Sequence, residues 1–148
     1  MKSARLRRLE RIARAHRRAA EVELASARDR LTSARDRERA AETGRRQAVA
    51  ERQAALAAGI DAGQARNLEA VVEAWRSELA AAARTRREAE VGYEGAHRAL
   101  VEAHRHQRSL DLLAAGARRR EAQEQALRER EAADEQALLR FAFDPEGR

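Results

Sequence analysis

A stripe of small and apolar residues, spaced alternately three and four positions apart, runs along the second half of this chain. Thirteen of its fifteen positions are apolar or aromatic, and only Arg86 and Gln107 interrupt it. The positions are Leu68, Val72, Trp75, Leu79, Ala82, Arg86, Ala89, Tyr93, Ala96, Leu100, Ala103, Gln107, Leu110, Ala114 and Ala117. A repeat of 3.5 residues kept over roughly seven heptads is typical of a helix in a coiled coil, so the stripe predicts a partner helix along its length.

The first half of the chain repeats this spacing less strictly and supplies the expected partner. Its stripe runs through Leu6, Leu9, Ala13, His16, Ala20, Leu24, Ala27, Leu31, Ala34, Glu38, Ala41, Arg45 and then Ala48 or Val49. If the chain folds back near residue 60, Glu38 and Arg86 come within about one layer of each other, where an ion pair would fix the register. In the same fold Arg45 falls opposite Trp75, and we expect its guanidinium over the indole face.

The strongest break in the pattern is the segment 59–64, which joins the two stripes. Gly59 suits the left-handed position that ends a helix, and Asp61 followed by Gln64 has the form of a capping box. A connection this short favours an antiparallel pair of neighbouring helices. The sequence therefore predicts an all-α, single-domain rod over residues 1–148: a long antiparallel two-helix coiled coil with helices at about 2–58 and 62–143, a turn at 59–61, and Pro145 beyond the second helix.

Composition excludes several classes of protein. Only four of the 148 residues are aromatic and none is cysteine, which argues against a compact globular core and a disulfide framework. The chain has no apolar run long enough for a membrane span, no apolar core of a secretory signal, no glycine-rich phosphate loop and no Ser-His-Asp set. His97 and His104 are two helical turns apart, too far to share one metal without further ligands. We therefore expect no enzymatic activity, no cofactor and no metal site.

Charge and apolar residues mark the two chain ends. The first 18 residues carry eight basic side chains, among them Arg5, Arg7 and Arg8, against the single acid Glu10. Such a segment fits an acidic partner surface, although a solvated arginine-rich helix face explains it as simply. From Arg119 onward the second helix has no expected partner, so it forms an overhang with alternating charges. The overhang ends in apolar side chains that suggest a docking surface, namely Leu138, Leu139, Phe141 and Phe143.

Two segments carry a resemblance to a known family. The turn Gly59-Ile60-Asp61-Ala62 leads into Arg66-Asn67-Leu68, and an acidic pair in the run 129–141 precedes an apolar and basic stretch that closes with Phe141. Together with two unequal antiparallel helices, these features resemble FliJ, the small stalk component of the flagellar type III export apparatus. The related YscO-like stalk proteins of injectisomes look much the same, so the flagellar and injectisome alternatives both stay open.

The resemblance implies a non-enzymatic stalk and adaptor. Proteins of this kind occupy the middle of a hexameric export ATPase ring, touch the large export-gate membrane protein and handle export chaperones, which implies a cytoplasmic location at the inner face of the plasma membrane. The family's gate-contacting positions match Val71, Trp75, Glu78 and Ala82 here, and we expect the terminal residues, including Arg5, Arg7, Arg8 and the docking surface at 138–143, to meet the ring. A generic coiled-coil scaffold and a basic nucleic-acid-associated helical protein are the alternatives.

Overall fold

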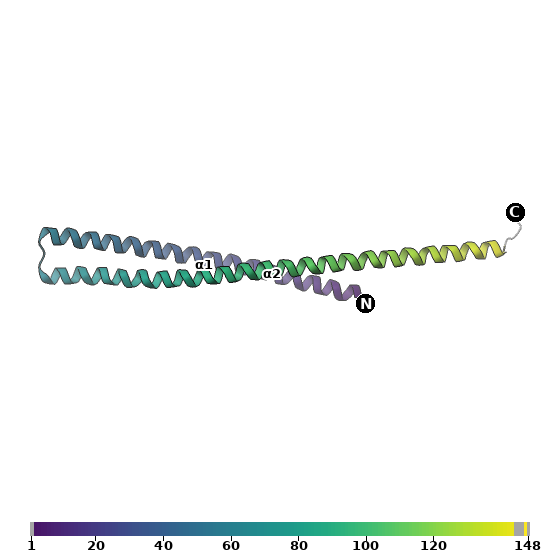
Figure 1. Cartoon of the computed structure of the whole chain (residues 1–148), viewed down its shortest axis with the longest axis horizontal. Coiled ribbons are helices and arrows are strands. Elements are labelled where there is room, and N and C mark those ends of the chain that lie inside the picture. Colours follow the sequence, from purple (N-terminus) through teal and green to yellow (C-terminus); the bar gives the residue numbers. More distant parts are fainter. Residues whose placement is uncertain (1, 144–146, 148) are drawn as a thin grey trace. The chain divides into compact units, whose positions relative to one another are not determined.

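The structure consists of two long α-helices, which pack against each other as a hairpin beside the turn that joins them (Figure 1). This computed structural model describes residues 2–143 and Gly147, without the side chains of Lys2 and Ser3. Helix α1 spans Lys2–Ala58, helix α2 spans Ala62–Phe143, and the described residues contain no strand. The helices begin and end where the sequence signals indicate. Pro145, expected beyond the second helix, lies outside the described residues.

The turn between the helices has the capping geometry that the sequence predicts. Gly59 has a positive φ of 79°, and its N–H donates to the carbonyl oxygen of Leu56 at 3.3 Å. The carboxylate of Asp61 accepts a hydrogen bond of 2.8 Å from the N–H of Gln64. A residue with a side chain would be strained at this φ, and without Asp61 one of the free N–H groups of α2 would lose its protein partner. The left-handed Gly59 is therefore confirmed, and so is the bond of the predicted capping box that Asp61 accepts.

Contacts divide the chain into two units, each of which contains a stretch of both helices. The turn-containing unit comprises residues 18–102, in which α1 and α2 run side by side away from the turn (Figure 1). Its buried apolar residues come from both predicted stripes and are mostly alanine: Ala27, Leu31, Ala34, Ala41, Ala48, Val72, Ala82 and Ala96. Because short side chains fill most of this core, each of the few larger ones contributes a large share of the buried apolar area.

The terminal unit comprises residues 1–17 and 103–148, and its described core is partly polar. Ala13, Leu110 and Ala114 are buried as predicted, but Leu9 and His16 are exposed, which corrects their assignment to the stripe. Their places are taken by Glu10, which is buried, and by the half-buried Arg17. The strict alternation of four and three residues passes through Glu10 and Arg17, and helical geometry prevails over the hydrophobicity of the adjacent residues. The Glu10 carboxylate lies 3.8 Å from the guanidinium of Arg118.

Candidate partner-binding surfaces

The first candidate surface lies on α2 in the turn-containing unit and consists of Val71 and Trp75. Val71 is 45% exposed and Trp75 is 37% exposed, so the two apolar side chains remain accessible one helical turn apart. The covered part of the indole lies against Gly44 of α1: a Cβ built on this glycine would be 2.7 Å from each of three ring carbons. The ring is therefore partly covered by its own chain and partly available to a partner.

The expected contact between Arg45 and the indole is replaced by a local ion pair. The guanidinium of Arg45 binds the carboxylate of Glu42 at 3.1 and 3.3 Å, on its own helix. Glu42 also accepts a hydrogen bond of 3.0 Å from Arg46. The bond from Arg45, followed by that from Arg46, lowers the pKa of Glu42 below its ordinary value. Two arginines are thereby held along α1, and the ring packs on the neighbouring glycine instead.

The other two residues assigned to this surface by resemblance differ sharply in access. Glu78 is partly exposed, and its carboxylate binds Arg37 of α1 at 2.8 and 3.1 Å. Ala82 is 0% exposed and packs within the core of the unit. A partner that approaches the hairpin in this conformation can contact Val71, Trp75 and Glu78 but cannot reach the side chain of Ala82.

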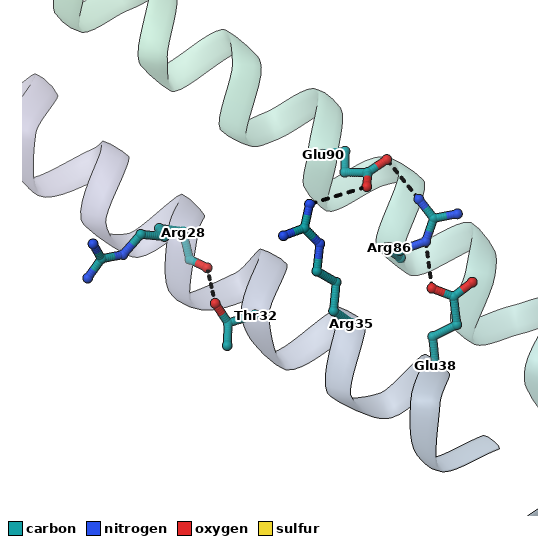
Figure 2. A network of polar contacts seen from close by, with 6 residues as sticks. All are labelled: Arg28, Thr32, Arg35, Glu38, Arg86 and Glu90. Atoms are coloured by element: carbon teal, nitrogen blue, oxygen red, sulfur yellow. Dashed lines mark hydrogen bonds and ion pairs between the residues drawn. The ribbon is translucent and has the colours of Figure 1, made fainter. Parts of the chain in front are cut away.

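A network of charged residues joins the two helices farther along the same unit (Figure 2). Nε of Arg86 lies 2.6 Å from the carboxylate of Glu38 across the helix pair, and Nη1 of Arg86 binds Glu90 at 2.8 Å. Arg35 approaches Glu90 at 3.7 Å. The hydrogen bond that Arg86 donates to Glu90, together with the charge of Glu38, raises the pKa of Arg86. The predicted ion pair of Glu38 and Arg86 is confirmed. The sequence did not indicate that Arg86 also binds a second carboxylate, that of Glu90.

The second candidate surface, in the terminal unit, is basic. Arg5, Arg7 and Arg8 are exposed on α1. Arg7, Arg11 and Arg14 line a shallow groove together with Glu10. A row of guanidinium groups on one helix attracts acidic partners over about the Debye length, and added salt weakens that attraction.

The third candidate surface, also in the terminal unit, is the apolar C-terminal patch of Leu138, Leu139, Phe141 and Phe143. All four side chains are exposed, up to 86% for Phe143. Every residue from Arg118 to Phe143 is exposed as well. Large apolar side chains that the described residues leave uncovered are typical of a site that buries its area against another molecule.

Comparison with known proteins identifies the family. The family model described as Flagellar FliJ protein matches residues 1–144. The chain belongs to the FliJ family. No curated protein and no solved structure matches it. FliJ-family proteins are non-catalytic components of the flagellar export apparatus. In this FliJ-family chain, neither helix has a stretch within the described residues that is apolar enough to cross a bilayer.

Sequence reasoning missed the residue of α1 on which the indole of Trp75 packs, Gly44. A glycine inside a helix indicates only a weak point, and the stripe directs attention to Arg45 as the residue opposite Trp75. The available signal was the coincidence of an interior glycine with the widest side chain of the facing helix. Glycine at such a place indicates a close approach of a bulky group to the backbone.

Proposed function

We propose that this protein is a non-enzymatic stalk and adaptor of the flagellar export apparatus, which engages the export ATPase ring, the export gate and export chaperones. The observation that carries the proposal is the family match over residues 1–144. Its location would be the cytoplasm, at the inner face of the plasma membrane through its partners. The architecture we propose is a coiled coil whose second helix extends beyond the first as an overhang from about residue 119.

The gate contact is assigned to the surface near the turn. Val71 and Trp75 supply accessible apolar area, and Glu78 adds a carboxylate whose partner is Arg37. Aromatic side chains that are partly covered by their own chain lose little conformational freedom on binding and are frequent anchors of interfaces. Ala82, the fourth residue assigned by resemblance, supports this surface from within the core.

The ATPase contact is assigned to the terminal unit. Arg5, Arg7 and Arg8 provide steering toward an acidic surface, and the apolar C-terminal patch provides area to bury in a collar of the ring. The two contributions differ in their response to salt, because charge attraction is screened and apolar burial is not. Engagement that depends on both should weaken with salt without disappearing.

The first experiment is a pull-down with the tagged full chain from extract of its own cells, with the recovered proteins identified by mass spectrometry. Recovery of an export ATPase or of the cytoplasmic region of the gate would support the proposal. Recovery of nucleic acid alone would favour the basic nucleic-acid-associated protein, and recovery of the chain itself would favour a scaffold. Either of these results would overturn the proposal.

The gate assignment is tested with the double variant Val71→Asp and Trp75→Asp. Binding to the purified cytoplasmic region of the gate should be lost while far-UV circular dichroism still reports a helical chain. The matched control is Val91→Asp, which places the same charge at an exposed valine of α2 in the same unit. A variant that unfolds would show instead that Val71 and Trp75 are structural residues of the helix pair. A folded variant that binds as the control does would show that they are not gate contacts.

The ATPase assignment is tested with a chain truncated after Arg130, and with the milder double variant Phe141→Ser and Phe143→Ser. Both should weaken engagement of the ATPase ring. The control is Leu112→Ser with Leu113→Ser, which removes apolar area from exposed positions elsewhere in the terminal unit. Unchanged engagement of the truncated chain would mean that the patch is not a contact.

A further inference from the structure

The contact between Trp75 and Gly44 sets this glycine apart from the others inside the described helices. A Cβ at Gly44 would be 2.7 Å from three carbons of the indole, a separation that Cβ atoms essentially never show. Gly92, Gly95 and Gly116 of α2 have nothing within 4 Å of the corresponding position. The space above Gly44 is therefore filled by one side chain, that of the single tryptophan of the chain.

Glycine inside a helix weakens it relative to alanine, because the unfolded backbone has more freedom to lose. At Gly92 or Gly95 the absence of a side chain accommodates nothing in the described residues. At Gly44 it accommodates an aromatic ring that packs on the backbone of the facing helix. Any other residue at position 44 would push the ring away from α1.

We infer that Gly44 is a positioning residue for Trp75, which allows the indole to rest on α1 while 37% of the residue stays accessible beside Val71. The binding surface near the turn is then a joint product of both helices. The effect of Gly44 on partner binding rests on the proposed gate contact. Its effect on the position of the ring depends only on the packing of the indole against α1.

The ring position is tested with Gly44→Ala, with Gly92→Ala as the matched control. Because Trp75 is the one tryptophan in the sequence, its fluorescence reports this site alone. In Gly44→Ala the displaced indole should emit at longer wavelength and be quenched more strongly by acrylamide, whereas Gly92→Ala should leave both signals as in the wild type. Unchanged emission and quenching in Gly44→Ala would overturn the inference.

Thermal unfolding adds a readout that separates the ring from the helix. Alanine should raise the melting temperature at Gly92, and it should fail to raise it at Gly44 while Trp75 is present. In a chain that carries Trp75→Ala, Gly44→Ala should raise the melting temperature as Gly92→Ala does. Equal effects of Gly44→Ala in both backgrounds would show that the ring and the glycine are independent, against the inference.

Binding to the cytoplasmic region of the gate completes the test. Gly44→Ala should weaken this binding about tenfold, a loss typical of a displaced interface anchor, while Gly92→Ala should leave it unchanged. If the wild-type chain does not bind the gate and the fluorescence still shifts in Gly44→Ala, the gate contact fails and the positioning role stands. If the gate binds the wild type and Gly44→Ala equally well, the role of Gly44 in partner binding is refuted.

Discussion

Replacing Leu31 by alanine tests whether the few large residues of an alanine-rich core carry a large part of its stability. Leu31 is only 6% exposed and packs in the turn-containing unit. The substitution removes three carbon groups, and at about 0.8 kcal/mol for each buried group the loss is roughly 2.4 kcal/mol before any cavity cost. A cavity that the helices do not close would increase this loss to about 3 kcal/mol or more.

The matched control is Leu56→Ala, the same change on the same helix. Leu56 is 54% exposed, so its replacement should lose only about half as much transfer free energy, on the order of 1 kcal/mol. Urea unfolding, monitored by far-UV circular dichroism, gives the free energy of unfolding of each variant. The values can be compared when the dependence of this free energy on urea concentration is the same in the variants and the wild type. Equal losses at the two positions, or a larger loss at Leu56, would refute the claim that Leu31 is packed between the helices.

Three smaller predictions concern the helices themselves. Gly92→Ala should stabilise the chain by about 1 kcal/mol, because its Cβ meets open space and alanine favours the helix; thermal unfolding measures this. Asp61→Ala should cost about 1 kcal/mol through the lost bond to the N–H of Gln64, and Asp61→Asn should restore most of it in urea unfolding. Bonds from two neighbouring arginines lower the folded pKa of Glu42, so its contribution exists above the unfolded pKa and disappears as the pH falls through the folded one. Glu42→Gln should therefore flatten the acid side of a stability–pH curve, and an unchanged curve would contradict this.

The helix bounds and the turn could be predicted because local chemistry alone determines them. Gly59 and Asp61 act within a few residues of their own positions, where no distant contact competes. The ion pair of Glu38 and Arg86 was also accessible from sequence, since both residues interrupt stripes that must face each other. A periodic pattern specifies which face is buried whenever the period is kept.

The errors arose where hydrophobicity and helical period disagree. Leu9 and His16 were assigned to the stripe of α1, yet the strict period passes through Glu10 and Arg17. A two-helix hairpin leaves much of each helix uncovered, so an exposed leucine costs little and cannot shift the phase of a helix more than fifty residues long. The contact of Gly44 with Trp75 was missed because the expected register sets Trp75 opposite Arg45, the next residue along α1, although an interior glycine facing the widest side chain was a usable signal.

Helical phase also explains why the residues assigned to the gate by resemblance divide into two groups. Val71, Trp75, Glu78 and Ala82 follow one another at intervals of four, three and four residues, so they form a stripe of their own on α2. This stripe meets the core stripe at Trp75 and Ala82, and access falls from Val71, 45% exposed, to Ala82, which is fully buried. A partner that docks here would therefore contact mainly the end of this stripe nearer the turn, at Val71 and Trp75. Ala82→Ser should lower the stability of the chain and leave its affinity for the gate unchanged. Val71→Ser should lower the affinity for the gate and leave the stability unchanged. Equal effects of the two variants on affinity would show that the helices separate when the gate binds.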